Sequence, residues 1–263
     1  MRLATWNVNS IRARIDRVGA WLTRNDVDVL ALQESKARDD QFPRERLEAL
    51  GYEVAHYGLN QWNGVAILSR RGLSDVTVGF DGDPGWGDPA TSEARAIGAT
   101  VGGIRIWSLY IPNGRQLEDP HMDYKIAWLK ALHADAVGWM AAGPTVLCGD
   151  WNIAPFDEDV WSVEYYADKS HVSPRERAAF TAFLDAGFVD VARPHTPGPG
   201  VYTYWDYTQL RFPKRQGMRI DFVLASPDVA GRVLAARIDR EERKGKGASD
   251  HAPVVVEIAE DRP

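Results

Sequence analysis

The sequence contains little cysteine: Cys148 is the one cysteine among 263 residues. A lone cysteine excludes an internal disulfide and a cysteine-based zinc cluster, and it is typical of a protein from a reducing compartment. Long hydrophobic runs are also lacking, and Arg2 is followed by an alternating strand pattern in place of a signal peptide. These absences predict a cytoplasmic protein that has no membrane partner.

A basic excess is missing as well. The chain has 31 lysines and arginines against 37 aspartates and glutamates, which gives a net charge of -6. Because a protein that coats nucleic acid is usually basic, this balance argues against passive DNA coating. It does not argue against a metallonuclease, which needs acids to hold a cation. One segment, 207–220, does contain basic residues and no acid: Arg211, Lys214, Arg215 and Arg219.

Apolar periodicity predicts strands and helices that do not alternate strictly. Strand-like runs occupy residues 2–6, 27–32, 64–68, 96–101, 104–111, 145–148, 201–205, 220–225, 233–238 and 254–258. Helical spacing of apolar residues marks 11–22, with Asn9 or Ser10 as its cap, and 126–140. A third helix is predicted after Ser173, where a capping box coincides with a proline in the first turn. The pattern predicts an α/β or α+β fold with two packed sheets in a single domain, residues 1–263.

Polar side chains gather where the predicted strands begin or end. They come from both halves of the chain: Asn7, Glu34, Tyr110, Asn113, Asp150, Asn152, Asp221, Asp250 and His251. Taken singly, each has an ordinary explanation, since a carboxylate after a strand is usually a solvated turn and a tyrosine is usually a core residue. Taken together, they lie where an open sheet presents its functional site.

The acids favour a hard divalent cation. Carboxylates such as Glu34 and Asp250, aided by amide oxygens, suit magnesium. Zinc is disfavoured because the six histidines form no spaced cluster and no cysteine pair exists. A cation of this kind, an activated water and donors for the charge on phosphorus are the requirements of phosphodiester hydrolysis.

The remaining polar residues supply the other requirements of that reaction. If strand geometry continues, Asp150 and Asn152 lie on the same face, where one can act as a base and the other can hold water or phosphate. A protonated His251 can stabilise the phosphorane, and Asp221 is the natural carboxylate to orient its ring. Two further side chains can donate hydrogen bonds to a phosphate: Tyr110 and Asn113.

Five motifs in this chain order resemble a known group of enzymes. They are residues 2–12 (RLATWNVNSIR), 32–36 (LQESK), 111–114 (IPNG), 217–221 (GMRID) and 247–253 (GASDHAP). Together they look like the endonuclease/exonuclease/phosphatase superfamily, and within it the exonuclease III family of abasic-site endonucleases. The similarity covers nearly the whole chain. It implies an α+β (α/β) fold, a four-layered αββα sandwich with two mixed sheets flanked by helices.

The resemblance implies a role for most of the polar set. Three residues are expected near the metal: Glu34 as principal ligand, with Asn7 and Asp250. The expected catalytic residues are Asp150, Asn152, His251, Asp221 and Tyr110. Asn113 matches a phosphate-contacting residue, and the basic segment adds candidate DNA contacts at Arg211, Lys214, Arg215 and Arg219. Residues that fall where the family holds a flipped-out, base-less sugar are Tyr204, Met218 and Ile220, with Trp205 beside them.

The resemblance implies a monomeric DNA repair phosphodiesterase that uses Mg²⁺, with Mn²⁺ as a substitute. Its expected partners are duplex DNA with abasic sites or recessed 3′ ends. It would cleave 5′ of the lesion, act as a 3′–5′ exonuclease and clean 3′ ends. One alternative is a phosphatase of the same superfamily that acts on a phosphoinositide or nucleotide, which suits the basic 207–220 segment less well. The other is a DNA-binding protein that has lost catalysis, which the intact acid–amide–histidine set disfavours.

Overall fold

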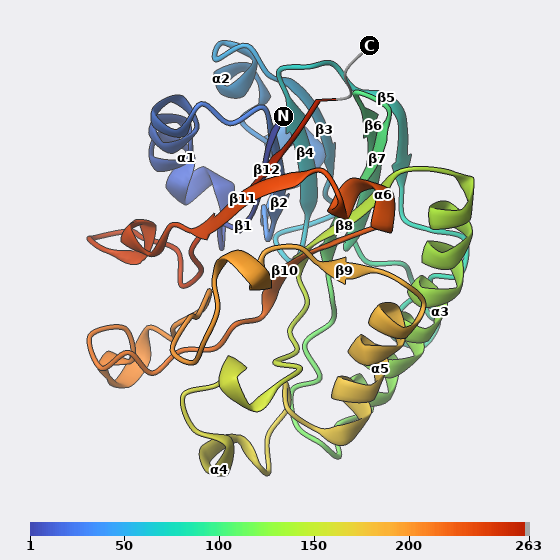
Figure 1. Cartoon of the computed structure of the whole chain (residues 1–263), viewed down its shortest axis with the longest axis vertical. Coiled ribbons are helices and arrows are strands. Elements are labelled where there is room, and N and C mark those ends of the chain that lie inside the picture. The colour runs from blue at the N-terminus through green and yellow to red at the C-terminus, as the bar shows by residue number, and fades with distance from the viewer. Residues whose placement is uncertain (261–263) are drawn as a thin grey trace.

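The computed structural model describes residues 1–260, and in that range the strands form two six-stranded mixed sheets (Figure 1). The first sheet contains, in spatial order, β11 (Val233–Ile238), β12 (Val254–Ile258), β1 (Arg2–Asn7), β2 (Val29–Gln33), β4 (Val65–Ser69) and β3 (Glu53–Tyr57). The second contains β5 (Ser74–Val78), β6 (Ala96–Val101), β7 (Ile104–Tyr110), β8 (Thr145–Asp150), β10 (Asp221–Ala225) and β9 (Val189–Asp190). The predicted pair of packed sheets is confirmed.

Helices cover the outer face of each sheet. The helices are α1 (Ile11–Asn25), α2 (Arg44–Glu48), α3 (Pro120–Ala142), α4 (Val163–Tyr166), α5 (Pro174–Asp185) and α6 (Pro227–Ala230). Trp21 of α1 and Leu47 of α2 lie in the apolar cluster on the first sheet, and Trp128 of α3 and Phe180 of α5 lie in that on the second. A third cluster fills the space between the sheets. The layers are therefore helix, sheet, sheet and helix, as the resemblance implied.

Local sequence signals account for where the main helices begin. The Ser10 side chain accepts the Ala13 N–H and caps α1, and such a cap satisfies one of the amides that a helix start leaves unpaired. Ser173 and Glu176 form the predicted capping box at the start of α5, with Pro174 in the first turn. Short-range signals were thus sufficient for these boundaries.

The structure corrects the strand prediction at four places. Residues 201–205 form no strand, and Tyr204 makes isolated bridges to Met218 and His251 instead. The short strands β3, β5 and β9, by contrast, were not predicted. All three lie at the edge of a sheet, where a strand pairs on one side only and needs no strong apolar pattern. No helix within residues 1–260 combines the length and the apolar character required to cross a membrane.

Strand register brings the polar strand ends to one end of both sheets. In the second sheet, Asp150 at the end of β8 is in register with Tyr110 of the parallel β7 and with Asp221 of the antiparallel β10. In the first sheet, Asn7 ends β1 beside the end of the parallel β2, and the antiparallel β12 begins next to them. Segments that are far apart in the sequence therefore meet at one edge.

Candidate active site

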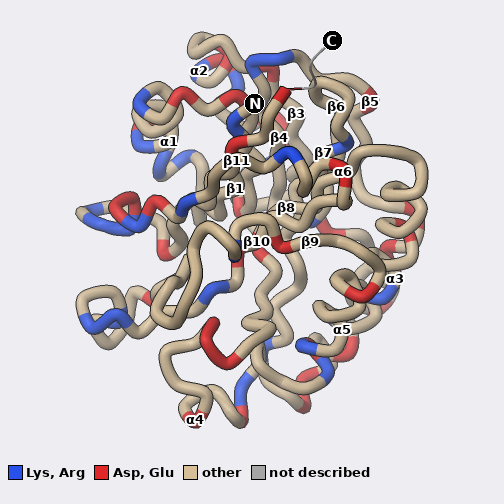
Figure 2. Tube along the Cα trace, in the orientation of Figure 1, with Lys and Arg blue, Asp and Glu red and all other residues tan. Residues whose placement is uncertain are grey.

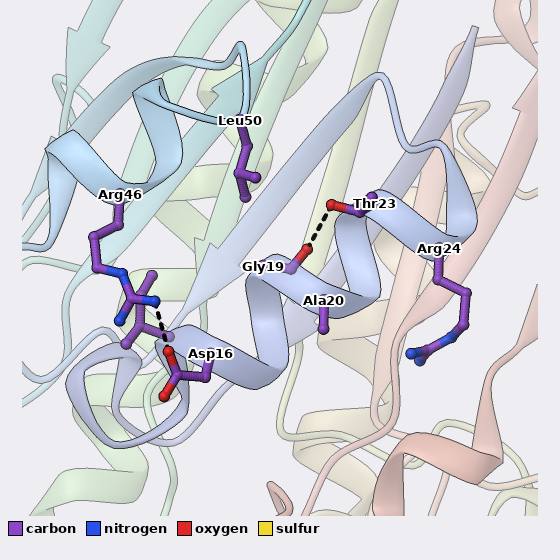
Figure 3. A pocket seen from close by; sticks show the side chains of 8 residues that line it. Asp16, Gly19, Ala20, Thr23, Arg24, Arg46 and Leu50 are labelled. Carbon is purple, nitrogen blue, oxygen red and sulfur yellow. Dashed lines mark hydrogen bonds and ion pairs between the residues drawn. The ribbon is translucent and has the colours of Figure 1, made fainter.

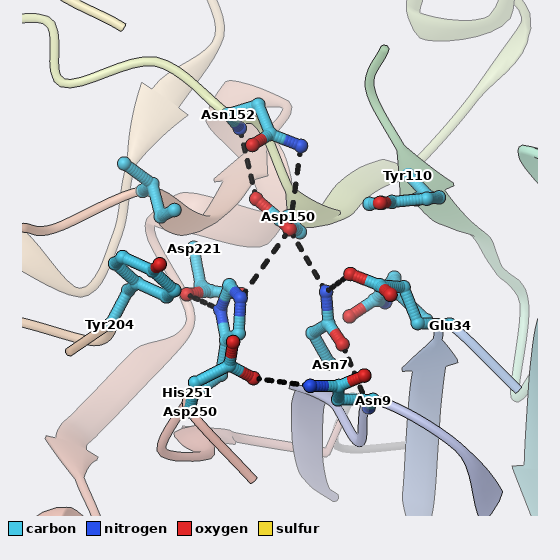
Figure 4. Close-up of polar contacts among 12 residues, drawn as sticks. Asn7, Asn9, Glu34, Tyr110, Asp150, Asn152, Tyr204, Asp221, Asp250 and His251 are labelled. Atoms are coloured by element: carbon cyan, nitrogen blue, oxygen red, sulfur yellow. Dashed lines mark hydrogen bonds and ion pairs between the residues drawn. The ribbon is translucent and has the colours of Figure 1, made fainter. Parts of the chain in front are cut away.

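Asn7 joins the two sheets at the centre of the polar cluster (Figure 4). Its Nδ2 donates to Glu34 Oε1 at 2.8 Å and to Asp150 Oδ2 at 3.0 Å. Its Oδ1 accepts the Asn9 N–H at 3.0 Å, and this bond fixes which end of the amide faces the carboxylates. Asn7 thus lies beside the proposed metal ligand Glu34, as expected, and presents its N–H groups to the two acids.

Glu34 is held as a carboxylate on a tightly constrained turn. Burial acts to raise its pKa, but the charge of Lys36 and the Asn7 hydrogen bond outweigh burial and lower the pKa. Lys36 Nζ lies 2.8 Å from Glu34 Oε2. Glu34 and Lys36 both have positive φ angles, 52° and 49°, which are uncommon for residues other than glycine. Such backbone strain persists only where the surroundings impose it, as at functional sites.

His251 is fixed between two buried aspartates. Its Nδ1 lies 2.8 Å from Asp221 Oδ2, and its Nε2 lies 3.7 Å from Asp150 Oδ2. Burial alone would lower the histidine pKa, but Asp221 and Asp150 together raise it to about 10. The ring is therefore an imidazolium at neutral pH. A cation held in this way can stabilise negative charge that develops on a phosphate.

Asp150 is suited to exchange a proton near neutral pH. Burial raises its pKa to about 7, with Asp221 and Glu34 acting in the same direction and His251 opposing them. A group with a pKa near the working pH is an effective general base. Sequence reasoning placed Asn152 beside Asp150 by extending the strand, but β8 ends at Asp150 and Asn152 has a φ of 50°. The Asn152 N–H instead donates to Asp150 Oδ1 at 2.9 Å, which closes a turn.

Asn152 connects the acids to a second group of hydrogen-bonding side chains. Its Oδ1 accepts from Asn113 Nδ2 at 3.1 Å and lies 3.2 Å from His171 Nε2. Its Nδ2 donates to the Ile111 carbonyl at 3.0 Å. The structure thus brings Asn113 into the site beside Asn152. Sequence reasoning missed His171, because a histidine in a polar segment before a helix carries no spacing that separates it from an exposed one.

Tyr110 faces Glu34 and remains a hydrogen-bond donor. Burial and the nearby Glu34 carboxylate, to which it is hydrogen-bonded, raise its pKa well above the ordinary value. The Arg95 guanidinium lies over the Tyr110 ring, 4.9 Å from its centroid, and fixes the position of the ring. Its hydroxyl therefore retains the proton and points towards the two carboxylates (Figure 4).

A buried ion pair supports the Asn152 turn. The side chains of Lys125 and Glu176 are 0% exposed, and Lys125 Nζ lies 2.5 Å from Glu176 Oε1. Lys125 Nζ also donates to the Asn152 carbonyl at 2.6 Å. Glu176 in turn accepts the His171 N–H at 2.9 Å, so the pair holds both residues in place. Because water does not reach this pair, removal of one member would leave the other charge buried without a partner.

We expect Lys125→Met to lower the free energy of unfolding by about 3–5 kcal/mol, because it leaves the Glu176 carboxylate buried without its cation. Denaturant unfolding of the purified variant measures this loss. Lys130→Met is the matched control on the exposed side of the same helix and should change stability little. The double variant Lys125→Met/Glu176→Gln removes the buried charge and keeps an amide oxygen for the His171 or Ser173 donors, so it should be less destabilised than Lys125→Met alone. A larger loss in the double variant would contradict the assignment.

We expect His171 to make the free energy of unfolding depend on pH in the acidic range. Burial, reinforced by the charge of Lys125, lowers its pKa from 6.5 to about 4. Between these two values the unfolded chain binds a proton that the folded chain excludes, so stability falls as pH falls through this window, by at most about 1.4 kcal/mol per pH unit. Urea unfolding from pH 4 to 7 should show a shallower slope for His171→Asn than for the parent chain. Equal slopes would show that His171 is not held neutral.

A groove lies beside the histidine dyad and contains part of the predicted sugar pocket. Tyr204 and Met218 line it, and the Tyr204 ring centroid lies 4.9 Å from that of His251. Ile220 lies in the apolar cluster beneath Met218. Trp205 is 1% exposed and belongs to a different cluster, so it does not line the groove and its predicted place in the pocket is corrected.

The basic segment divides into exposed and buried residues. Lys214 and Arg215 are exposed, as a DNA contact requires. Arg211 is mostly buried, although it lines the groove, and its guanidinium donates to Gln216 and stacks over aromatic rings. The side chain of Arg219 is 3% exposed and lies 3.4 Å from Asp190. Arg219 therefore supports the fold from inside, and its predicted contact with DNA is corrected.

One group of side chains in the described range 1–260 has the composition and spacing of a metal site. Glu34, Asp150 and His251 each offer a ligand atom within 4.8 Å of the others. Because His251 is protonated, the two carboxylates are the available donors, and carboxylate oxygens suit a hard divalent cation. Asp250 lies outside this group, and its Oδ1 accepts from Asn9 Nδ2 at 3.1 Å. The residues present therefore fit a hard cation that Glu34 and Asp150 would hold.

A second hollow lies between α1 and α2, away from this group (Figure 3). Its walls are mainly small and apolar side chains together with Arg24 and Arg46. Its one acid, Asp16, is bound to Arg46 at 2.6 Å. The hollow lacks a pair of titratable groups that could carry out catalysis, so the strand-end cluster is the candidate active site.

Comparison with known proteins shows the family to which this chain belongs. The family model described as "Endonuclease/Exonuclease/phosphatase family" matches residues 4–251. A Bacillus subtilis exodeoxyribonuclease is 30% identical over 97% of this chain and 98% of its own length. A 3′ phosphatase from Neisseria, solved with a product DNA hairpin, is 38% identical with a TM-score of 0.93, covering 98% of this chain and 99% of that one. An AP endonuclease from Archaeoglobus fulgidus is 34% identical with a TM-score of 0.91 and the same coverage.

The two packed sheets and the acids at the strand ends fit the family whose model matches nearly the whole described chain. We conclude that this protein is a nuclease of the endonuclease/exonuclease/phosphatase family.

Proposed function

We propose that this protein is a Mg²⁺-dependent DNA repair phosphodiesterase, with Mn²⁺ as a substitute for Mg²⁺. It cleaves duplex DNA 5′ of an abasic site and removes nucleotides or blocking groups from 3′ ends. The observation that carries the proposal is the cluster in which Asn7 links Glu34 to Asp150 while His251 faces Asp150 from the other side. The names of the relatives, which include an exodeoxyribonuclease, a 3′ phosphatase and an AP endonuclease, support this range of reactions.

The residues around Asp150 divide the work of hydrolysis. Asp150 accepts the proton of the attacking water, and Asn152, hydrogen-bonded to Asp150, positions that water or the phosphate. The His251 imidazolium, oriented by Asp221, donates to a non-bridging phosphate oxygen. Tyr110 can donate its hydroxyl proton to the leaving oxygen. When bound by Glu34 and Asp150, Mg²⁺ would supply positive charge next to the phosphate and leaving oxygens.

The surface around the site suits a duplex. Two loops, 207–216 and 239–247, protrude on the left of Figure 1, and Figure 2 shows that both carry lysine and arginine. They lie side by side, because Arg211 of the first and Lys244 of the second line one hollow. Exposed cations in such a position can contact phosphates on either side of a scissile bond. An extended polyanion such as a nucleic-acid backbone can use several such cations at once, which favours a polynucleotide substrate over a phosphoinositide.

A labelled duplex with one stable abasic analogue tests the proposal, incubated with and without Mg²⁺. Matched undamaged duplexes with a recessed 3′ end and with a 3′-phosphate complete the set. We expect Mg²⁺-dependent cutting at one position, directly 5′ of the lesion, together with shortening or cleaning of the 3′ ends. Changes at the 3′ ends alone would remove the abasic-site reaction from the proposal. If no duplex changes, the superfamily phosphatase acting on a phosphoinositide or nucleotide becomes the better assignment.

A further inference from the structure

A buried chain of polar side chains lies directly behind the turn that carries Glu34. Ser35 Oγ lies 2.8 Å from His56 Nε2, and His56 Nδ1 lies 2.7 Å from Asp39 Oδ1. Ser35 is 0% exposed and the His56 side chain is equally inaccessible, whereas Asp39 reaches the surface. The Gly58 N–H also donates to Asp39 Oδ1 at 3.0 Å. The three side chains thus form a line from solvent to the residue that follows Glu34.

The order Ser–His–Asp is also that of a hydrolytic triad, but access excludes this role here. A Cβ placed on Gly64 would lie 2.0 Å from Ser35 Oγ, so the backbone of that glycine covers the hydroxyl. The Phe42 ring stacks on His56 with 4.0 Å between centroids and closes another side. A substrate carbonyl or phosphate therefore cannot reach Ser35 Oγ. The three side chains therefore have a structural effect on the residues around them and no contact with substrate.

Proton positions along the line follow from its charged end. Because Asp39 faces Nδ1, the proton of the neutral ring is placed on Nδ1, and Nε2 is left to accept the Ser35 O–H. Burial keeps the ring neutral, since it lowers the His56 pKa to about 4 against the opposing effect of Asp39. The Asp39 carboxylate thus faces the protonated end of the ring at 2.7 Å, and Ser35 Oγ lies 2.8 Å from the other end.

The Ser35 side chain is the central anchor of a strained turn. Residues on both sides of it, Glu34 and Lys36, have positive φ angles. Backbone bonds also hold the turn: the Ser10 N–H donates to the Glu34 carbonyl at 2.7 Å, the Ser35 N–H donates to the Gly64 carbonyl at 3.0 Å, and the Ser35 carbonyl accepts the Ile11 N–H at 3.1 Å. Loss of the His56 acceptor would leave the Ser35 hydroxyl buried without a partner and would loosen the turn. Glu34 would then be free to turn its carboxylate away from Asp150.

We propose that His56, through Ser35 and with Asp39 setting its tautomer, is a positioning residue that holds Glu34 ready to bind the divalent cation. This inference deepens the proposed function and rests on the role of Glu34 as a metal ligand. Outer partners of metal ligands commonly change metal affinity by 10–100-fold when they are replaced. His56 should therefore affect cation affinity far more than the chemical step, which takes place at Asp150.

Direct metal binding tests the proposal, measured as loss of the free Mn²⁺ signal in electron paramagnetic resonance of the full chain. We expect His56→Leu and Ser35→Ala each to weaken Mn²⁺ binding about tenfold. The double variant should be no weaker than either single one, because both remove the same bond. His56→Gln places an amide oxygen near the position of Nε2 and should restore most of the affinity. At saturating metal, kcat of each variant should remain within about threefold of the parent.

Tyr52→Phe is the matched control. It removes a buried hydrogen bond from the same face of the first sheet, to the Val27 carbonyl, and so lowers stability without touching the turn. If Tyr52→Phe weakens Mn²⁺ binding as much as His56→Leu does, or if His56→Leu and Ser35→Ala bind like the parent, the positioning role is overturned. Should His56→Leu fail to fold, Ser35→Ala still decides the matter. Failure of the proposed function is separate, since Glu34→Gln would then bind Mn²⁺ as well as the parent.

Discussion

Glu34→Gln should lower kcat/KM on a cleaved DNA substrate by about 1000-fold, which corresponds to about 4 kcal/mol of transition-state stabilisation. The substitution keeps the size of the side chain and removes one of the two carboxylates that face the proposed cation. It should also abolish tight Mn²⁺ binding. Folding should be little affected, because the amide keeps the size of the side chain and its one oxygen can still accept one of the two bonds, from Asn7 or from Lys36, that the carboxylate accepts.

The measurement combines steady-state cleavage over a Mg²⁺ titration with thermal unfolding. Glu257→Gln provides the control, because this acid also pairs with a cation, Arg2, but on a strand far from the polar ends. It should retain full activity. Turnover of Glu34→Gln at the parent rate in chelator-treated buffer with added Mg²⁺ would overturn the metal assignment.

Asp150→Asn should lower kcat by about 1000-fold even at saturating metal, because the loss of a general base costs on the order of 10²–10⁴-fold. The raised pKa of Asp150, about 7, means that its charge is disfavoured in the folded state. Between the unfolded value of 3.8 and this folded value, stability contributed by the carboxylate decreases as pH rises. The neutral asparagine should therefore leave thermal stability at pH 7 unchanged or higher.

Single-turnover cleavage distinguishes the two acids, since it separates the chemical step from product release. For Asp150→Asn, excess Mg²⁺ should not restore the rate. A full rescue by metal would show instead that Asp150 acts mainly as a ligand. Asp157→Asn is an exposed control whose carboxylate pairs with Arg177, and its activity should equal that of the parent.

Elements with strong local signals were predictable from the sequence. The capping box at Ser173 and the apolar face of α1 indicated those helix starts, and buried strands such as β6 and β12 agree residue by residue with their apolar runs. The short edge strands β3, β5 and β9 were missed because one-sided pairing leaves little trace in hydrophobicity. The segment 201–205 was mistaken for a strand because its aromatic residues pack in apolar clusters, although its backbone makes only isolated bridges.

The candidate site also has features that the sequence predicted and features that it did not. Motif order identified Glu34, Asp150, Asp221 and His251, and the structure brings all four together. The motifs did not predict the direction in which the side chains point. Asn7 presents its nitrogen to the acids, and Arg219 points into the interior. Residues that support the site, such as Lys125, are distant in sequence and sit in ordinary apolar helical patterns. Their importance follows from burial alone, which no local pattern records.

The sequence by itself determined the chemical type of this protein, because the acids, amides and histidine that hydrolyse phosphodiesters follow strands in a recognisable order. Only the tertiary structure decided how these groups work. Packing two sheets face to face places Asp150 beside Asp221, Glu34 and His251, and burial at that junction raises the aspartate pKa to about 7 and makes the histidine a cation. Electrostatic properties of this kind depend on distance and on exclusion of water, and both arise only when remote segments of the chain meet.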